Sequence, residues 1–303
     1  LSETEVLLLK KNVFTGSGVA LVTPFNENGV NFDELGKMLD YHVNNGTDAI
    51  IICGTTGEAS TMPDEEHCSV IKYAVQRING AIPVIAGTGS NDTPHAVKLS
   101  QFAENAGADA ILSVTPYYNK ATQEGLICHF NKIANSINIP MILYNVPSRT
   151  GCNIKPETVL KLSETENIVG IKEASGNLSQ AAKIASVCPS DFTMYSGNDD
   201  QVLPILSLGG KGVISVIANI APKDTHDMVY KFLEGNLEEA ISLQLKMIDL
   251  IEALFCEVNP IPVKTAMNLL GWNAGDLRLP LTPMNGADLE RLKTSLKNYG
   301  LLK

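Results

Sequence analysis

The sequence predicts a closed (β/α)8 barrel, a TIM barrel, followed by a C-terminal helical subdomain. Short apolar segments recur at intervals of roughly 20 to 35 residues, and each is apolar on both faces, as expected of parallel strands covered by helices. Segments with the period of amphipathic helices lie between them. Eight such units fit within about 200 residues, which favours a closed barrel over an open sheet.

Eight segments are the candidate strands, in chain order. They are SGVALVT (17–23), DAIIICG (48–54), IPVIAG (82–87), DAILSV (109–114), IPMILYN (139–145), NIVGIKEA (167–174), FTMYSG (192–197) and GVISVIA (212–218). The first helix is predicted to begin after a capping Asp33 and to end at Gly46. NGTDAIIICG and NAGADAILSV share a glycine, Asp-Ala and then a strand, which indicates an internal repeat of βα units.

This pattern divides the chain into three parts. Residues 16–232 form the predicted barrel, and residues 236–303 form the helical subdomain after a break at EGN. Residues 1–15 begin without methionine and join no predicted element, so we expect a terminal tail or a segment added for expression.

Composition and charge point to a folded protein that acts on a small molecule. Hydrophobic residues make up 44% and charged residues 18%, which is ordinary usage for a soluble globular protein. The net charge of −10 argues against a nucleic-acid surface, which needs clustered Lys and Arg. No apolar run reaches the roughly 18 residues of a membrane span. We therefore expect a cytoplasmic protein, and an anionic substrate would need a locally placed cation or backbone donors.

The spacing of cysteine and histidine predicts neither disulfides nor a metal site. The cysteines show no CxxC spacing, so we expect unpaired thiols in a reducing compartment. The histidines form no HxxxH or HxH cluster, so no metal is expected. The residues concerned are Cys53, Cys68, Cys128, Cys152, Cys188 and Cys256, and His42, His67, His95, His129 and His226.

The stretch IVGIKEASGN (168–177) places Lys172 at the end of a strand that should be buried. Side chains alternate along a strand, so Gly170 and Lys172 are expected to point into the barrel if Val169 and Ile171 face the helices. The glycine would then leave room beside the lysine. Burial disfavours a charged ammonium group and lowers its pKa, and a neutral amine can form a Schiff base with a carbonyl.

A structural interpretation of Lys172 is an ion pair with a buried carboxylate, Glu58 or Glu173. YNVPSRTG at the end of the fifth strand favours chemistry instead, because its tyrosine lies at the level of the lysine, one strand away. The phenol of Tyr144 can relay protons, and the planar guanidinium of Arg149 suits a carboxylate. If either residue stood alone, a core tyrosine or a surface arginine would be the favoured interpretation.

The segment CGTTGEAST (53–61) follows the second strand. Its glycines free the backbone, and Thr55 and Thr56 offer hydroxyls and consecutive amides that can hold a carboxylate. The alternative is a capping turn, in which Ser60 or Thr61 caps the next helix.

Three further strand ends carry polar or aromatic segments. Tyr117 and Tyr118 in VTPYYNKAT form an aromatic patch, which more often marks an interface. AGTGSND (86–92) and YSGNDD (195–200) resemble phosphate loops, but neither has the P-loop lysine or the GxGxxG spacing.

Eight motifs in order carry a resemblance to a known family. GVALVTPF, GTTGEAST, AGTGSND, TPYYNK, YNVPSRTG, GIKEASGN, SGND and GVISVIAN span residues 18 to about 219. With them the chain resembles the Schiff-base pyruvate aldolases and lyases, the family of dihydrodipicolinate synthase and N-acetylneuraminate lyase. The helical tail with NPIPVKTAMNLLG fits the C-terminal part of that family.

The resemblance implies that Lys172 is the Schiff-base lysine that condenses with pyruvate, and that Tyr144 is the proton relay beside it. Thr55 would connect Tyr144 to Tyr118, which would reach across from a neighbouring subunit of a homodimer or homotetramer. Thr55 and Thr56 would also bind the pyruvate carboxylate. No cofactor or metal is implied, because the lysine itself acts as the electron sink.

The resemblance also implies the second substrate. Arg149 would hold the carboxyl end of L-aspartate-β-semialdehyde, the backbone of Gly197 and Ile214 would line the pocket, and cyclisation would release 4-hydroxy-tetrahydrodipicolinate for lysine and diaminopimelate biosynthesis. N-acetylneuraminate lyases tend to carry Ser-Thr in the glycine turn and lack the arginine, so the pair Thr55 and Thr56 together with Arg149 favours the synthase. The alternatives are such a lyase or a related aldolase, and a non-catalytic keto-acid-binding barrel, for which the relay residues have no use.

Regulation is where the chain departs from lysine-inhibited members of the family. Those members bind lysine at the tight-dimer interface with a histidine and a glutamate, which align here with Asp64 and His95. Losing that carboxylate removes a partner for the amino groups of lysine, although Asp64 could substitute in part, so we predict weak or absent lysine feedback. The candidate allosteric positions are Ser60, Asp64, His67, Asn91, His95 and Tyr117.

Overall fold

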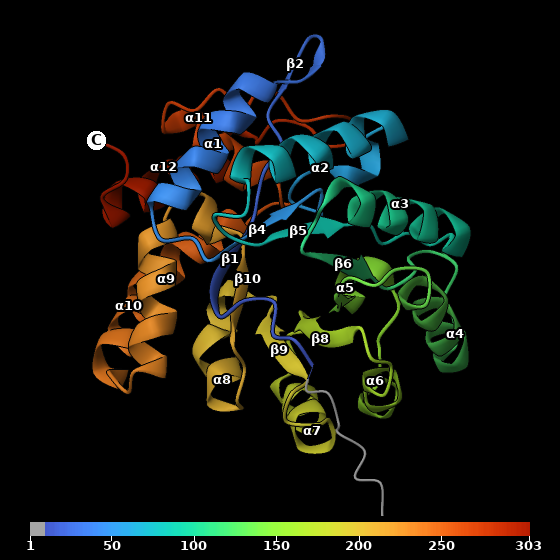
Figure 1. The fold of residues 1–303 in the computed structure, drawn as a ribbon. Helices are drawn as coiled ribbons and strands as arrows, with labels where there is room; N and C mark the ends of the chain where they lie inside the picture. The colour runs from blue at the N-terminus through green and yellow to red at the C-terminus, as the bar shows by residue number, and fades with distance from the viewer. Residues whose placement is uncertain (1–9) are drawn as a thin grey trace, which may run out of the picture.

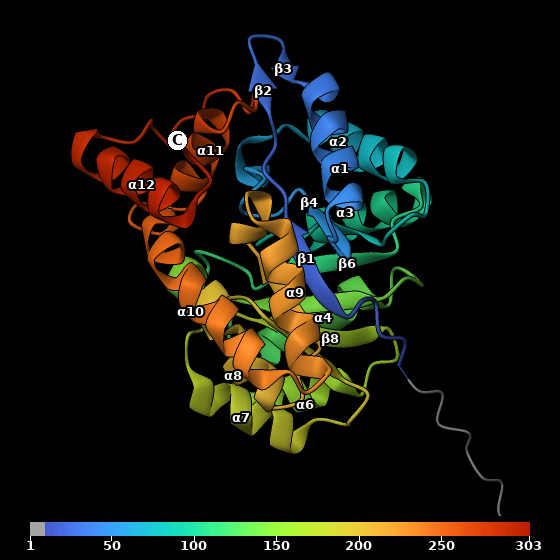
Figure 2. The same cartoon turned by 90° about the vertical axis from the view of Figure 1, so that its left-hand side faces the viewer.

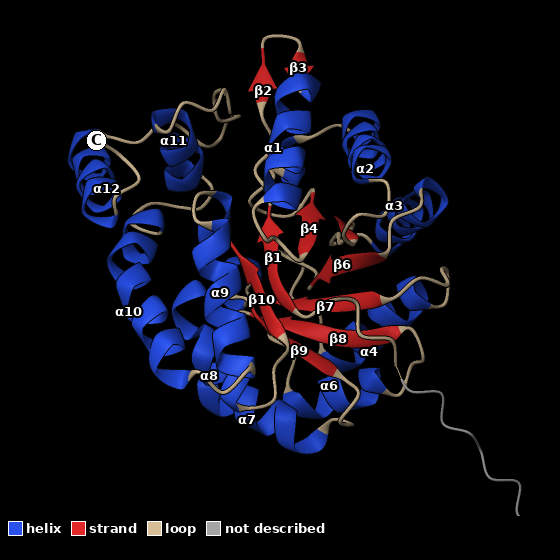
Figure 3. Ribbon diagram, turned by 60° about the vertical axis from the view of Figure 1, so that its left-hand side comes forward, coloured by secondary structure: helices blue, strands red, loops and turns tan. Residues whose placement is uncertain are grey.

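The computed structural model describes residues 10–303, and residues 1–9 lie outside the described part. Eight parallel strands close into a barrel in the order β1-β10-β9-β8-β7-β6-β5-β4, which confirms the predicted (β/α)8 architecture. Figure 3 shows these strands enclosed by helices. The strands are β1 (Gly16–Ala20), β4 (Ala49–Ile52), β5 (Val84–Gly87), β6 (Ala110–Val114), β7 (Met141–Asn145), β8 (Ile168–Glu173), β9 (Thr193–Ser196) and β10 (Gly212–Ser215).

The helices between the strands form the outer layer of the barrel (Figure 1). Their apolar sides pack on the strands and bury a continuous shell of aliphatic residues. They are α1 (Phe32–Asn44), α2 (Asp64–Ile78), α3 (Thr93–Ala106), α4 (Gln123–Ala134), the single turn α5 (Pro147–Thr150), α6 (Pro156–Ser163), α7 (Leu178–Val187), α8 (Val202–Ser207) and α9 (Pro222–Leu233).

A short antiparallel hairpin follows β1 and was not predicted from the sequence. It pairs β2 (Phe25–Asn26) with β3 (Gly29–Val30) and projects from one end of the molecule (Figure 1). Strands of two residues carry too little periodicity for the sequence pattern to reveal them.

The start of α1 corrects the capping prediction. The N-cap is Asn31, whose side chain accepts a hydrogen bond from the backbone N–H of Glu34. Asp33 lies in the first turn instead, where its carboxylate still interacts favourably with the helix dipole. Either residue type can cap a helix, so the sequence alone does not decide between them.

A bulge in β8 changes which side chains enter the barrel. The pairing of β8 with β7 shifts by one residue between Met141 and Ile142. As a result Val169 lies in the interior cluster of the barrel, and the expectation that it faces the helices is wrong. Ile171 does pack in the outer shell, as predicted, and Lys172 pairs in register with Tyr144.

Gly170 is needed for a different reason from the one expected. A Cβ atom at this position would lie 2.4 Å from the carbonyl oxygen of Thr193 on β9. The glycine therefore permits the close approach of β8 and β9, and the space that its missing side chain leaves is filled by backbone rather than kept free beside Lys172.

Residues 10–15 pack against the N-terminal end of the barrel, although the sequence pattern assigned them to a tail. The ring of Phe14 stacks on Tyr195 with centroids 4.3 Å apart. The hydroxyl of Tyr195 donates to the carbonyl of Phe14 at 2.8 Å, and the ammonium of Lys10 donates to the carbonyls of Thr165 and Ile168. Val13 and Phe14 are the only apolar residues of this short segment, which is too few to give a period from which the contact could be foreseen.

The C-terminal subdomain is helical, as expected, and lies along one side of the barrel (Figure 2). It comprises α10 (Leu237–Leu254), α11 (Ile261–Leu269) and α12 (Gly286–Tyr299). α10 packs on α9 and α12, whereas α11 contacts the turn that follows β10. Within residues 10–303, no helix combines the length and the apolar composition that crossing a bilayer would need.

Candidate active site

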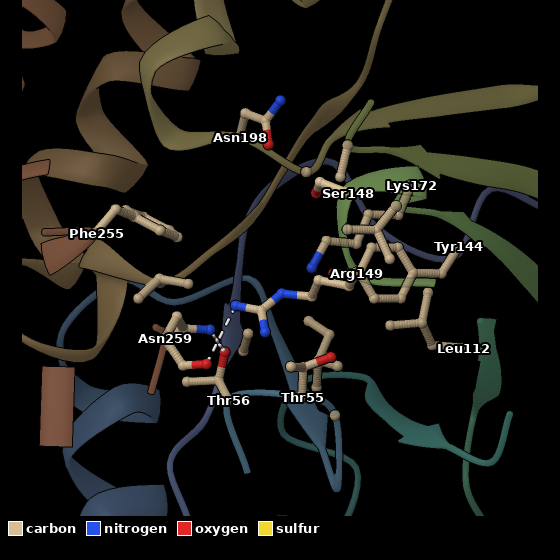
Figure 4. Close-up of a pocket in the computed structure, with 17 residues that line it drawn as sticks. Thr55, Thr56, Leu112, Tyr144, Ser148, Arg149, Lys172, Asn198, Phe255 and Asn259 are labelled. Atoms are coloured by element: carbon tan, nitrogen blue, oxygen red, sulfur yellow. Dashed lines mark hydrogen bonds between the residues drawn. The ribbon is translucent and has the colours of Figure 1, made fainter. Parts of the chain in front are cut away.

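A pocket of about 200 Å³ opens at the carboxyl ends of the barrel strands. Its wall includes Thr55 and Thr56 after β4, Tyr144 at the end of β7 and Lys172 on β8 (Figure 4). Gly197 after β9 also lines it. The fold thus brings together five residues predicted from the sequence at four different strand ends. Parallel strands of a barrel all end at the same rim, which explains the convergence.

Lys172 and Tyr144 form the centre of this pocket. Both side chains are buried, and the Nζ atom of Lys172 lies 4.4 Å from the centroid of the Tyr144 ring. The ring face carries partial negative charge, which stabilises a cation, and it shields the amine from water. Within residues 10–303, the ammonium of Lys172 forms no ion pair.

The two carboxylates considered as structural partners of Lys172 are bound elsewhere. Glu58 pairs with Lys264 at 2.7 Å. Glu173 accepts a hydrogen bond from the backbone N–H of Ser175 at 2.7 Å and another from Asn145 at 3.0 Å. The structural interpretation of Lys172 therefore lacks the partners on which it depended.

The turn at 53–61 does not act as a helix cap. α2 begins after Pro63, and no side chain caps it. Ser60 is exposed, and the hydroxyl of Thr61 donates to the carbonyl of Glu58, inside the turn. The capping alternative is therefore wrong, and the consecutive threonines before this point are left facing the pocket.

Arg149 reaches the pocket from the one-turn helix α5. Its guanidinium donates to the carbonyl oxygen of Asn259 at 3.1 Å, and the side-chain amide of Asn259 donates to the hydroxyl of Thr56 at 3.0 Å (Figure 4). Asn259 therefore links the two candidate carboxylate-binding groups.

Asn259 is not among the site residues that the sequence pattern indicates. It lies between α10 and α11 and is 5% exposed, with its Oδ1 atom buried and without a partner among the described residues. Asparagine before proline is common in loops, so only the fold shows that this loop reaches the barrel rim.

Two further candidates lie outside the pocket wall of this single chain. Ile214 on β10 is buried in the barrel interior and is absent from the lining of the pocket. Tyr118 is 89% exposed, with a backbone φ of 75° in the left-handed region, and its neighbour Tyr117 is 38% exposed. A positive φ is uncommon for a residue other than glycine, so the backbone of this segment is held in an unusual conformation.

Asp64 and His95 are the two candidate allosteric positions at which the chain departs from lysine-inhibited members of the family. Their side chains contact each other. The Nε2 atom of His95 lies 2.9 Å from Oδ1 of Asp64, and the ammonium of Lys98 lies 3.2 Å from Oδ2. Hydrogen bonds from His95 and then from Lys98 lower the pKa of the Asp64 carboxyl. This carboxylate already has two basic partners.

Of the remaining candidate allosteric positions, His67 lies close enough to Asp64 and His95 for both to influence its pKa. His67 is buried and bonds to the carbonyl oxygen of Gly87 at 2.9 Å, and its burial lowers its pKa. The carbonyl of Asn91 accepts a hydrogen bond from the side chain of Asn119.

The described residues contain no group of three His, Cys, Asp or Glu side chains that could hold a metal ion. The six cysteines are free thiols, as predicted. Burial raises the pKa of the Cys53 thiol, which keeps this residue of the glycine turn protonated.

The chain is similar to known proteins over almost its whole length. Residues 13–299 match the Dihydrodipicolinate synthetase family. A 4-hydroxy-tetrahydrodipicolinate synthase of Acetivibrio thermocellus is 63% identical, over 97% of this chain and 100% of that protein.

Solved structures of dihydrodipicolinate synthases are also similar to this chain. A dihydrodipicolinate synthase of Acinetobacter baumannii, complexed with pyruvate, has a TM-score of 0.92 and 43% identity, covering 96% of this chain and 100% of that one. The synthase of Cyanidioschyzon merolae with lysine bound has a TM-score of 0.94 and 42% identity, covering 96% of this chain and 100% of that one. The barrel, the motifs at its strand ends and these matches show that the chain belongs to the dihydrodipicolinate synthetase family.

Proposed function

We propose that this protein condenses pyruvate with L-aspartate-β-semialdehyde to give 4-hydroxy-tetrahydrodipicolinate. The observation that carries the proposal is the buried amine of Lys172, 4.4 Å from the ring of Tyr144 in a pocket whose opposite wall offers Thr55 and Thr56. A lysine without a carboxylate partner in such a place is suited to attack a carbonyl. The similar proteins that are named 4-hydroxy-tetrahydrodipicolinate synthase support the same two substrates.

Pyruvate is carried as an imine on Lys172. The amine attacks the keto carbon of pyruvate and water leaves, and loss of a proton from the methyl group then gives an enamine. The imine nitrogen accepts the electron pair in that step, so no metal or cofactor is required. The amides and hydroxyls of Thr55 and Thr56 hold the carboxylate and fix the orientation of the methyl carbon.

The enamine carbon then attacks the aldehyde of the second substrate. Arg149 binds the carboxylate of L-aspartate-β-semialdehyde, and its hydrogen bond to the carbonyl of Asn259 holds the guanidinium over the pocket. The amino group of the semialdehyde then displaces the imine lysine, which closes the ring and frees Lys172.

Tyr144 moves the protons that these steps require. We propose that Thr55 connects it to Tyr118 of the partner subunit, so that the active site is complete only in a homodimer or a homotetramer of dimers. The exposure of Tyr118 supports this arrangement, because an aromatic side chain that is 89% exposed is otherwise costly in contact with water. The free thiols support a reducing compartment, and we propose the cytoplasm as its place of action.

Borohydride trapping tests the proposal. Reduction in the presence of pyruvate should fix one pyruvate on the chain, and peptide mass mapping should place it on Lys172. Lys264 is a matched internal control, because it is also a buried lysine but is paired with Glu58. An adduct on Lys264, or none at all, would overturn the mechanism.

Turnover identifies the substrate. In the absence of borohydride, L-aspartate-β-semialdehyde should be consumed together with free pyruvate, whereas N-acetylneuraminate should not be cleaved. Cleavage of N-acetylneuraminate without consumption of the semialdehyde would assign the chain to the lyases, and trapping without either reaction would favour a keto-acid-binding barrel.

A further inference from the structure

A buried ion pair joins the glycine turn to the C-terminal subdomain. The Nζ atom of Lys264 lies 2.7 Å from Oε1 of Glu58, and each side chain is only 1% exposed. The second oxygen of Glu58 accepts a hydrogen bond from the backbone N–H of Arg278 at 2.9 Å. Lys264 also donates to the carbonyl of Asp276 at 2.9 Å, and its ammonium lies over the ring of Phe25. Both charges are thus partnered on more than one side.

The position of Glu58 connects this pair to the proposed pyruvate site. Glu58 lies two residues after Thr56, with a φ of 57° in the left-handed region. Its backbone N–H donates to the carbonyl of Thr55 at 3.1 Å, and the N–H of Gly57 donates to the carbonyl of Gly54. Because these bonds close the turn on itself, a displacement of Glu58 is passed to the two threonines.

Stability alone is a weak explanation for such a pair. The cost of removing two charges from water can exceed their attraction, and well-packed apolar residues are often as stable in the same place. The ion pair does constrain the orientation of the Glu58 side chain. Its carboxylate must contact the ammonium of Lys264 with one oxygen and the backbone N–H of Arg278 with the other. Groups that bind a transition state have to be held within a fraction of an ångström.

We propose that Glu58 and Lys264 are positioning residues that set the turn carrying Thr55 and Thr56. The inference rests on the proposed function, and it gives the C-terminal subdomain a role in pyruvate binding. Neither residue touches the substrate. Lys264 on α11 fixes Glu58, Glu58 fixes the turn, and the turn presents its amides and hydroxyls to the pyruvate carboxylate.

The test uses a double variant, Glu58→Gln with Lys264→Met. Changing Lys264 alone would leave the Glu58 carboxylate buried and unpaired. The site would then unfold because of the uncompensated charge, whether or not the pair has a positioning role. In the double variant the glutamine still offers an acceptor to the Arg278 amide, and methionine fills the volume beside Phe25. A control double variant, Asp224→Asn with Lys246→Met, removes a 2.7 Å ion pair between α9 and α10 that does not involve the turn.

Pyruvate binding is measured by borohydride trapping at increasing pyruvate, without the second substrate, in wild type and both variants. We expect the half-saturating pyruvate concentration to rise about tenfold in the Glu58/Lys264 variant, as for the loss of one well-aligned hydrogen bond to a carboxylate. At saturating pyruvate, kcat and the KM for the semialdehyde should change by less than about twofold. The control should bind pyruvate like wild type.

The outcomes separate the two proposals. If wild type traps no pyruvate, the proposed function fails. If wild type traps pyruvate and the folded double variant has an unchanged half-saturating concentration, the positioning role is overturned. If the double variant does not fold, Glu58→Asp replaces it: the charge is kept but the side chain is one methylene shorter, so pyruvate should bind at least about threefold more weakly. Unchanged binding in that variant would equally overturn the inference.

Discussion

Tyr144 and Lys172 are paired in register on neighbouring strands, with the amine 4.4 Å from the centre of the phenol ring. We predict that Tyr144→Phe keeps the ring and the imine site but loses the proton relay. The kcat should fall by about 10²- to 10³-fold, while borohydride still fixes pyruvate on Lys172. Steady-state kinetics measures kcat, and borohydride trapping measures the pyruvate adduct. Tyr230→Phe on α9 is the control, and a Tyr144→Phe enzyme with wild-type kcat would refute the relay.

Arg149→Ala should act on the second substrate alone. Without the guanidinium, the KM for L-aspartate-β-semialdehyde should rise by about tenfold to a hundredfold, as for the loss of a charge-assisted hydrogen bond. Pyruvate trapping should be unchanged. Arg291→Ala, an exposed arginine on α12, provides the matched control. Equal losses for both substrates would show that Arg149 serves the pocket as a whole.

Mixing subunits tests whether Tyr118 is shared. A Tyr118→Ala chain and a Lys172→Ala chain should each be nearly inactive alone. Refolded together in equal amounts, they should recover about a quarter of wild-type activity, because half of the dimers are mixed and each has one complete site. No recovery, with mixed dimers confirmed by native mass spectrometry, would place Tyr118 in the site of its own chain.

Lysine at millimolar concentration should leave turnover nearly unchanged. The carboxylate of Asp64 is already bonded to His95 and Lys98, so an incoming ammonium group has to displace them. Exchanging the pair, with Asp64→His and His95→Glu, should introduce inhibition. The turnover rate of the wild type and of the variant is measured with and without lysine. Strong inhibition of the wild type would contradict the prediction.

Stability should fall as pH decreases from about 6.5 toward 4. Burial lowers the pKa of His42 to about 3 and that of His129 to about 4, from an ordinary 6.5. In this window the unfolded chain binds protons that the native state does not, so the free energy of unfolding rises with pH.

His42→Gln should flatten that dependence by up to about 1.4 kcal/mol per pH unit. Urea unfolding at fixed protein concentration, followed by circular dichroism, measures the slope. A slope that is the same in His42→Gln and wild type would contradict a buried neutral imidazole. His129→Gln gives a second, independent test of the same effect.

The sequence by itself determined the barrel and most of its rim. Eight apolar segments alternating with amphipathic ones leave little choice of architecture, and a parallel barrel places all strand ends at one rim. Lys172, Tyr144 and the threonines of the glycine turn could therefore be assigned to one site before their distances were known. Local pattern sufficed because each residue lies at the end of its own strand or just after it.

Only the tertiary structure decided the contacts between segments distant in the chain. Nothing in the local pattern places Asn259 against Thr56 or Lys264 against Glu58, since these pairs lie 203 and 206 residues apart. The β8 bulge that turns Val169 inward is likewise set by pairing with a neighbouring strand, not by the period of β8 itself. Such contacts depend on packing of whole elements, which sequence periodicity does not encode.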